Sequence, residues 1–263
     1  MKKKRIAVLF YGRIFLYDKI GYQNFIENFS EKYDLDFFLS TSPELNEDVD
    51  GFVNLVKPIS FNNDKIDSSI NLFDYTKSNF INFNKCKNAV PQFLNKYRVF
   101  NLLDEYISKK NINYDYIFVT RVDVFYYNCI DFESFHKIDD NNIYVPDGNL
   151  FGLPVPSGVN DHMAIGNYNS IKKYCSLYLY LEKYLNDGVI IRPETILLAH
   201  LINMNLKVTY YIRNYGIIPV NDPKYADKVY NYYKYYKQKN IKVPHWEFAV
   251  LNVNLEDYKN IHN

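Results

Sequence analysis

The chain has 263 residues, enough for one large α/β domain with a full hydrophobic core. Its 31 basic and 30 acidic residues give a formal net charge of +1, which excludes the strong positive field of a general nucleic-acid-binding protein. The three cysteines, Cys86, Cys129 and Cys175, form no CxxC pair, so we expect a reducing, cytoplasmic compartment. No uncharged apolar run is long enough to span a bilayer, so we expect no transmembrane segment.

The first elements predict a strand, a helix and a second strand. Residues 6–10 are a continuous apolar run, which is typical of a buried parallel strand. Residues 18–33 place apolar side chains at mostly helical spacing, and residues 35–41 predict the next strand. Because parallel strands need a crossover between them, this order indicates a mostly parallel sheet flanked by helices.

The middle of the chain holds the strongest pattern. We expect a strand at residues 51–58, then an irregular, Asn-rich region, and a helix at residues 91–109. The aromatic and β-branched run from residue 113 to 120 predicts a buried strand, which ends in Arg121-x-Asp123. Open α/β sheets hold their ligands at the carboxyl ends of such strands.

Arg121 and Asp123 are therefore the first candidate site residues. The Asp123 carboxylate suits a hard cation such as Mn²⁺ or Mg²⁺, which can neutralise a diphosphate. Arg121 stands where the common Asp-x-Asp pattern has its first carboxylate, and a guanidinium can bind a phosphate but not a metal ion. The plain alternative is that Arg121 and Asp123 form only a surface ion pair at the end of a strand.

The second half of the chain predicts further elements. Residues 143–146 indicate a strand, and a loop rich in Gly and Pro follows at residues 147–158. A helix is expected from the Asn167 cap to about residue 185, closed by Gly188. Another helix should open at Pro193, and residues 207–212 indicate a late strand.

Three more residues are candidates for chemistry on the acceptor side. Asp161 and His162 follow the loop, and Asp161 is the stronger candidate for a general base that takes a proton from a hydroxyl group. The alternative for Asp161 is an Asx turn. His162 is a candidate metal ligand or a structural residue, and Glu194 is either catalytic or a charge that stabilises the start of a helix.

Three residues could contact a nucleotide. Gly12 and Arg13 follow the first strand, where a small residue lets a ligand approach the backbone. Arg98, in the helix before the Asp123 strand, could reach a phosphate or simply face solvent. The sequence contains no GxGxxG, Walker, HExxH or GxSxG motif.

Taken in order, four segments resemble a group of small glycosyltransferases with the nucleotide-sugar fold called GT-A, known from bacterial polysaccharide clusters and from large DNA viruses. These segments lie at residues 7–13, 114–123, 160–166 and 192–197, and the resemblance covers residues 5–212. It implies a UDP- or GDP-sugar donor, with UDP favoured, and a Mn²⁺ or Mg²⁺ ion bound through Asp123. It also implies a glycan or glycoconjugate acceptor near Asp161 and Glu194, in the cytoplasm of the cell or of a viral host.

We therefore expect a GT-A-like (Rossmann-like) α/β domain at residues 1–212 and a Tyr-rich, helical C-terminal extension at residues 213–263 that packs on it. The expected activity is metal-assisted transfer of a sugar from a nucleotide donor. The alternatives are a catalytically silent carbohydrate- or protein-binding module with the same fold, and a nucleotidyltransferase. A nucleotidyltransferase should carry a Gly-rich loop after its first strand, and Tyr11-Gly12-Arg13 is poor in glycine.

Overall fold

A computed structural model describes residues 2–14, 18–42, 49–66, 83–136, 138–147, 158–189, 192–211 and 215–217. The strands are β1 (Lys4–Tyr11), β2 (Tyr33–Ser40), β3 (Ser60–Asn62), β4 (Tyr116–Arg121), β5 (Val124–Tyr126), β6 (Asn142–Pro146), β7 (Met163–Gly166), β8 (Lys207–Tyr211) and β9 (Tyr215–Ile217). The helices are α1 (Asp18–Phe29), α2 (Val49–Val56), α3 (Phe83–Lys110), α4 (Tyr168–Cys175), α5 (Leu181–Asn186) and α6 (Pro193–Asn203), with the 3₁₀ turns η2 (Phe132–Ser134) and η3 (Ser176–Tyr180).

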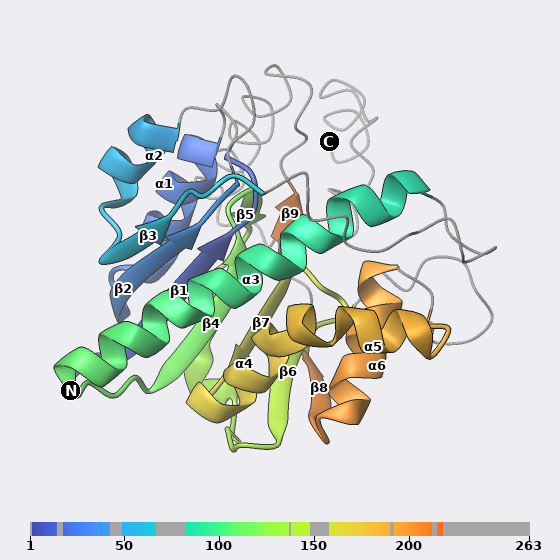
Figure 1. Cartoon of the computed structure of the whole chain (residues 1–263). Helices are drawn as coiled ribbons and strands as arrows, with labels where there is room; N and C mark the ends of the chain where they lie inside the picture. The colour runs from blue at the N-terminus through green and yellow to red at the C-terminus, as the bar shows by residue number, and fades with distance from the viewer. Residues whose placement is uncertain are drawn as a thin grey trace, which may run out of the picture.

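Seven strands form the central sheet, in the order β3-β2-β1-β4-β7-β6-β8 (Figure 1). The pairs β1–β2, β1–β4, β2–β3 and β6–β8 are parallel. Strand β7 is antiparallel to both of its neighbours, β4 and β6. The mixed, mostly parallel sheet flanked by helices that the sequence predicts for a GT-A-like domain is therefore confirmed.

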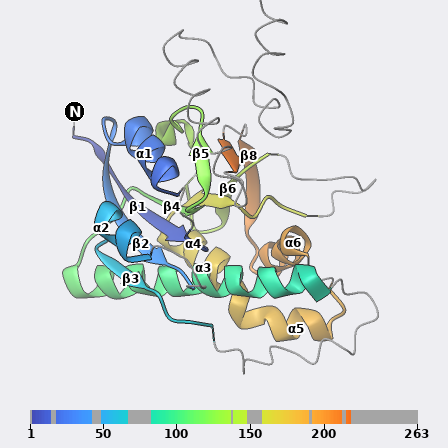
Figure 2. The same cartoon turned by 90° about the horizontal axis from the view of Figure 1, so that it is seen from above.

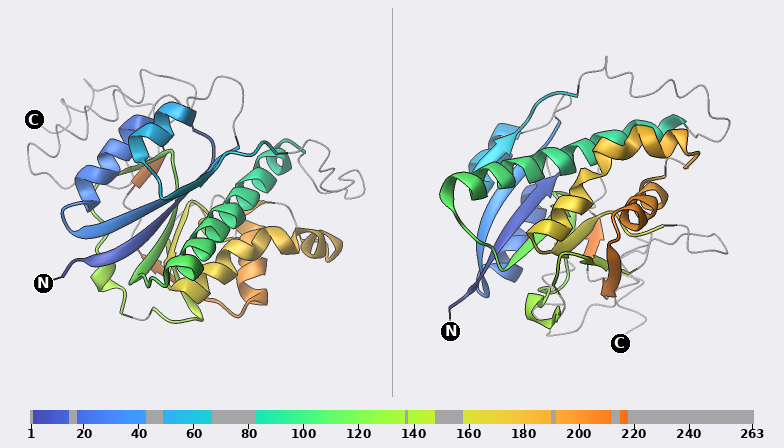
Figure 3. Two further views of the ribbon diagram at one scale, coloured as in Figure 1. Left: turned by 60° about the vertical axis from the view of Figure 1, so that its left-hand side comes forward. Right: turned by 60° about the horizontal axis from the view of Figure 1, so that its bottom comes forward.

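Alternation along β1 divides the interior into two cores. Ile6, Val8 and Phe10 face the side of α1 and α2, where they pack with Phe25 and Phe29. The odd-numbered neighbours on β1 face the opposite side, together with residues of α3, α4 and α6. Figures 2 and 3 show α3 running across one face of the sheet, away from α1. Successive strand side chains point to opposite faces, so a buried strand must be apolar on both.

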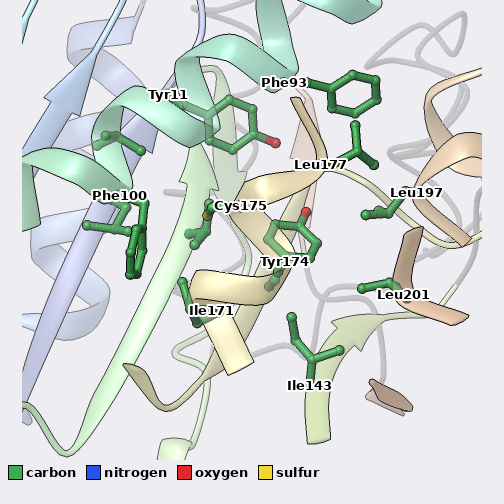
Figure 4. Packing of buried hydrophobic residues seen from close by; sticks show 14 of the residues in the cluster. Tyr11, Phe93, Phe100, Ile143, Ile171, Tyr174, Cys175, Leu177, Leu197 and Leu201 are labelled. Carbon is green, nitrogen blue, oxygen red and sulfur yellow. The ribbon is translucent and has the colours of Figure 1, made fainter. Parts of the chain in front are cut away.

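The core under α3 contains polar hydroxyl groups as well as apolar side chains. Tyr11 from β1 and Tyr174 from α4 are buried here beside Phe93 of α3 and Leu177 of η3. Figure 4 shows the hydroxyl groups of Tyr11 and Tyr174 pointing into the same region. Because buried hydroxyl groups need hydrogen-bond partners, this region marks where the core gives way to a polar site.

One predicted strand is wrong. Residues 49–56 form helix α2 rather than the strand expected at 51–58, and the nearby strand is the short β3. Val49, Phe52 and Val56 are the buried residues of α2, and their spacing of three and four is helical. The run of Val and Leu in this segment indicated a strand, but the spacing of its buried side chains is that of a helix.

The ends of the helices confirm some predicted boundaries and shift others. Helix α3 begins at Phe83, so Pro91 lies inside it rather than at its start. Asn167 caps α4 as predicted, and its side chain accepts a hydrogen bond from the Ser170 amide at 2.9 Å. The chain then passes through η3 into α5, which ends at Asn186, and Gly188 follows two residues later with φ of +78°. Pro193 opens α6 as predicted.

A second, two-stranded sheet joins β5 to β9 antiparallel, with Val124 opposite Ile217. Of the predicted C-terminal extension, residues 215–217 are described, and the rest lies outside the described residues. The predicted loop at 148–157 also lies outside them. Within the described part of the chain, none of the helices combines the length and the apolar character required to cross a bilayer.

Candidate functional site

The site begins at the carboxyl ends of the two central strands. Tyr11 ends β1 and Arg121 ends β4, and the two residues are partners in the parallel register. Tyr11 belongs to the core under α3, and Arg121 shares the parity of Ile117 and Val119, which also face that core. The sheet therefore presents a tyrosine and an arginine side by side toward α3 at the edge where ligands bind in open α/β folds.

Arg121 and Asp123 form a bidentate ion pair. The Arg121 Nε donates to Asp123 Oδ1 at 2.7 Å, and Nη2 donates to Oδ2 at 2.5 Å. The Asp123 side chain is 5% exposed, whereas the Arg121 side chain is 28% exposed. Burial opposes the charged guanidinium, but the charge and hydrogen bonds of Asp123 outweigh it, so the pKa of Arg121 lies above its usual value. Arg121 is a permanent, partly open positive charge.

Asp161 lies across from this pair, just before β7. Because β7 is antiparallel to β4, the start of β7 lies at the carboxyl end of β4. One oxygen of the buried Asp161 carboxylate accepts a short hydrogen bond from Gln92 Nε2 of α3. Burial disfavours the ionised form, but His162, Lys96, Gln92 and Arg121 together outweigh it and lower the pKa of Asp161. Asp161 is therefore a carboxylate at neutral pH.

Hydrogen bonds to backbone groups and to Tyr215 of β9 fix the residues around Asp161. The Tyr11 hydroxyl donates to the Asp161 carbonyl at 2.8 Å. The Asn160 side chain accepts from the His162 amide at 3.0 Å, which makes the predicted Asx turn at Asn160 rather than at Asp161. The Tyr215 hydroxyl lies 2.9 Å from Asn160 Nδ2 and 3.0 Å from His162 Nδ1. Strand β9 thus contributes a tyrosine to the site.

Lys96 of α3 is buried beneath this loop. Its Nζ donates to the Asp161 carbonyl at 2.7 Å and to the Tyr174 hydroxyl at 3.0 Å. The same ammonium lies 4.8 Å from the centre of the Tyr11 ring and 5.0 Å from that of Tyr174, within the range of cation–π attraction. Burial lowers the pKa of Lys96 to about 8, although Asp161 opposes this shift.

Glu194 lies at the start of α6, as predicted, and docks against the same loop. Its carbonyl accepts from the Val159 amide at 3.0 Å. The negative charge of Glu194 raises the pKa of Lys96, one of the smaller contributions at that lysine, so the two side chains are within electrostatic reach. Glu194 therefore lies near the cluster formed by Tyr11, Lys96, Arg121, Asp123 and Asp161. Its carboxylate also stabilises the start of α6, because it lies in the first helical turn.

The contact between α6 and the loop depends on Gly158. A Cβ atom added at Gly158 would lie 2.5 Å from Glu194 Cβ and 2.6 Å from its carbonyl carbon. The clashing atoms include the backbone of Glu194, so the start of α6 would have to move to accommodate an added Cβ atom. Gly158 is needed for close approach, since neither contact can be relieved by a side-chain rotation.

We expect Gly158→Ala to lower the free energy of unfolding by about 1–3 kcal/mol, as for other overpacked sites. Urea denaturation measures this loss. Gly188→Ala is the control, because its Cβ would meet nothing within 4 Å and only the positive φ opposes it. Glu194→Ala should not rescue Gly158→Ala, because the carbonyl group of residue 194 remains. A Gly158→Ala protein as stable as the wild type would contradict the predicted clash.

The remaining candidates lie at different distances from the cluster. Gly12 follows Tyr11 directly with φ of +115°, a conformation that favours glycine, and its amide donates to the Ser40 carbonyl at 3.2 Å. Arg13 is exposed beside it. Arg98 instead donates to the Asp64 carbonyl at 2.9 Å, so the structure gives it a partner outside the cluster.

The contacts of Asp123 and His162 decide whether the predicted metal site fits. Both oxygens of Asp123 are engaged by Arg121, and His162 Nδ1 faces the Tyr215 hydroxyl. No group of three His, Cys, Asp or Glu side chains suited to a metal ion is found among the described residues. Asp123 already accepts a hydrogen bond from Arg121 on each oxygen and belongs to no such group, so the described side chains do not fit the expected Mn²⁺ or Mg²⁺ site.

Sequence reasoning missed Lys96, Gln92, Tyr174 and Tyr215. For Lys96 a signal was present: Phe93, Lys96, Phe100 and Leu103 recur at helical spacing, so the lysine falls within the apolar stripe of α3. Gln92 lies one turn before Lys96 and reaches the same loop. Tyr215 carried no comparable signal, because its role depends on the pairing of β9 with β5.

Known proteins show limited similarity to this chain. A crystal structure of a "putative nucleotide-diphospho-sugar transferase" from Desulfovibrio desulfuricans G20 matches with a TM-score of 0.42 and 8% sequence identity, over 80% of each chain. This likeness is too low to carry an argument about fold or activity. No curated protein matches the sequence. The model of one family matches residues 1–208, most of the chain. The protein therefore belongs to the family described as Domain of unknown function (DUF7796).

Proposed function

We propose that the protein is a glycosyltransferase that moves a sugar from a nucleoside-diphosphate sugar, with UDP-sugars favoured, to a hydroxyl group of a glycan or glycoconjugate. One observation carries the proposal: the end of β4 and the start of the antiparallel β7 bring a partly exposed Arg121 and an ionised Asp161 to the ligand-binding edge of the sheet. A positive charge suits the departing diphosphate, and a carboxylate suits the attacking hydroxyl group.

The roles follow from what each side chain can do. Gly12 and Arg13 flank the nucleotide next to the end of β1, where the chain turns without a side chain at residue 12. Arg121 binds the diphosphate, and Asp161 receives the proton of the acceptor hydroxyl group as the new glycosidic bond forms and the bond to the diphosphate breaks. Glu194 lies beside this edge and is proposed to contact the acceptor.

A thermal-shift screen tests this function. UDP-, GDP- and CDP-sugars are added to the full chain, with the matching nucleosides as controls that lack phosphates. A ligand that binds only the folded state raises the melting temperature, so at a concentration of 100 Kd the folded state gains about 2.7 kcal/mol. We expect at least one nucleotide sugar, and no nucleoside, to stabilise the protein. Release of the diphosphate from that sugar then measures turnover.

The screen also separates the alternatives. Stabilisation without any release of diphosphate, even with oligosaccharide acceptors, would favour the silent binding module. Release of pyrophosphate from a nucleoside triphosphate and a sugar phosphate would favour the nucleotidyltransferase. If no nucleotide sugar changes the melting temperature, the proposed activity is wrong.

A further inference from the structure

We propose that Arg121 itself, held in place by Asp123, is the cation that binds the donor diphosphate, and that donor binding needs no divalent metal ion. This inference rests on the proposed function and replaces the metal ion that the sequence suggested. The observation behind it is the asymmetry of the pair, in which the Asp123 side chain is buried and the Arg121 side chain is partly exposed.

The geometry leaves donors for a ligand. A guanidinium has five N–H groups in one plane, and Asp123 accepts two of them, from Nε and Nη2. Among the described residues, Asp123 is the acceptor of the Arg121 side chain, so the N–H groups of Nη1 and the second one of Nη2 are directed elsewhere. These N–H groups can donate to the oxygens of a phosphate. Their planar, forked arrangement matches two phosphate oxygens at once, which favours arginine over lysine in phosphate sites.

Asp123 is better suited to orienting Arg121 than to binding a metal ion. A metal ion at Asp123 would have to share the carboxylate with the guanidinium, which already donates a hydrogen bond to each of its oxygens. Breaking a buried pair by removing one partner is strongly unfavourable. The second carboxylate nearby, Asp161, has one oxygen on Gln92 and lies among positive charges. The pair thus provides a fixed charge where a metal-dependent enzyme would bind an ion.

The experiment is isothermal titration of chelator-treated full-length protein with UDP and GDP, in EDTA and then in Mn²⁺. Arg121→Gln should weaken binding at least 30-fold in EDTA. Asp123→Asn keeps a side-chain oxygen beside the guanidinium and should weaken binding only a few-fold. The double variant Arg121→Gln with Asp123→Asn removes both charges together. It covers the case in which the single Arg121 variant fails to fold, and it should lose binding as Arg121→Gln does.

Arg5 offers a matched control. It also forms an ion pair with an aspartate, donating from Nε and Nη2 to Asp36 Oδ2 at 2.9 and 2.6 Å, but at the amino end of the strands. Arg5 and Asp36 also line a hollow there. Arg5→Gln should leave the affinity for UDP and GDP unchanged. A loss of affinity in this variant would place the diphosphate in that hollow and overturn the assignment to Arg121.

The remaining outcomes separate the two proposals. Binding that is equal in EDTA and Mn²⁺, lost in Arg121→Gln and largely retained in Asp123→Asn, supports the inference. Binding that requires Mn²⁺ and is lost in Asp123→Asn overturns the inference and leaves the proposed glycosyltransferase standing. If neither nucleotide binds in either condition and the nucleotide-sugar screen is also negative, the proposed function fails, and the inference fails with it.

Discussion

Replacing Lys96 with methionine should abolish a rise in stability that the wild-type protein shows between pH 8 and pH 10. Burial lowers the pKa of Lys96 in the folded state to about 8, whereas the pKa in the unfolded chain is 10.5. Over this window the unfolded chain binds the proton and the folded protein does not, so the free energy of unfolding increases with pH. At 1.36 kcal/mol for each unit, the wild type should gain about 2–3 kcal/mol relative to Lys96→Met.

Below pH 8 both states of the wild type carry the charge, and the cost of burying it is fully present. Above pH 10.5 both states are neutral and that cost is gone. Burial raises the pKa of the neighbouring Tyr11 and Tyr174 in the folded protein, and both proteins contain these tyrosines, so their effects largely cancel in the difference. Urea titrations at pH 7, 8, 9 and 10 measure the two stability curves.

Lys172→Met is the matched control for the lysine. Lys172 is exposed and lies 5.5 Å from the centre of the Tyr168 ring, so it resembles Lys96 in having an aromatic neighbour but not in burial. Because Lys172 is exposed, the Lys172→Met protein should keep the rise in stability that Lys96→Met loses. If Lys96→Met shows the same pH dependence as the wild type, Lys96 is not a buried cation.

Asp161→Asn should lower turnover at least about 10²-fold while leaving the affinity for the nucleotide nearly unchanged. A positioned general base contributes roughly 10²–10⁴-fold, and an amide cannot accept the proton of the acceptor. Because His162, Lys96, Gln92 and Arg121 lower the pKa of Asp161, the carboxylate is ionised throughout the neutral range. Steady-state kinetics with the sugar found in the screen give kcat and KM, and calorimetry gives the Kd.

Asp104→Asn is the control for this substitution. Asp104 of α3 is also a partly buried carboxylate that accepts a short hydrogen bond, in this case from Tyr168. Asp104→Asn should change stability but not turnover. If Asp161→Asn keeps wild-type turnover while its fold and donor affinity are intact, the proton goes to another group and the proposed role of Asp161 is wrong.

Asp161 should also contribute to stability in a pH-dependent way. Because its pKa is lowered in the folded state, the contribution is present above the unfolded value of 3.8 and is lost as pH falls through the folded value. Asp161→Asn lacks this contribution. The difference in stability between the two proteins should therefore shrink when the pH is lowered from 6 to 3.

The sequence determined the central strands because their apolar runs are long and both of their faces are buried. The predicted strands at residues 6–10, 35–41 and 113–120 correspond to β1, β2 and β4, and with them the position of Arg121 and Asp123 at a strand end could be predicted. The two side chains do form an ion pair, but its carboxylate is buried rather than at the surface. Whether the pair also binds a diphosphate, with or without a metal ion, stays a prediction.

Other features could not be predicted from local patterns. Met163–Gly166 has only four residues, and a short apolar run does not reveal whether a strand is parallel or antiparallel. The apolar stripe of α3 indicates that Lys96 is buried but not which groups it contacts. Its partners Asp161, Tyr174 and Tyr11 come from three other parts of the chain, so these contacts are visible only in three dimensions.

The antiparallel run of β7 has a consequence for how accurately Asp161 is positioned. Ala164 faces the core under α3, whereas Met163 and Ile165 face the core beside α1. If β7 shifted by one residue along β4, Met163 or Ile165 would point into the space that now holds the methyl group of Ala164. A cavity would open on the other face of the sheet. The packing of these side chains therefore fixes the register of β7 against β4. With it, packing fixes the distance between the Asp161 carboxylate, three residues before Ala164, and the Arg121 guanidinium.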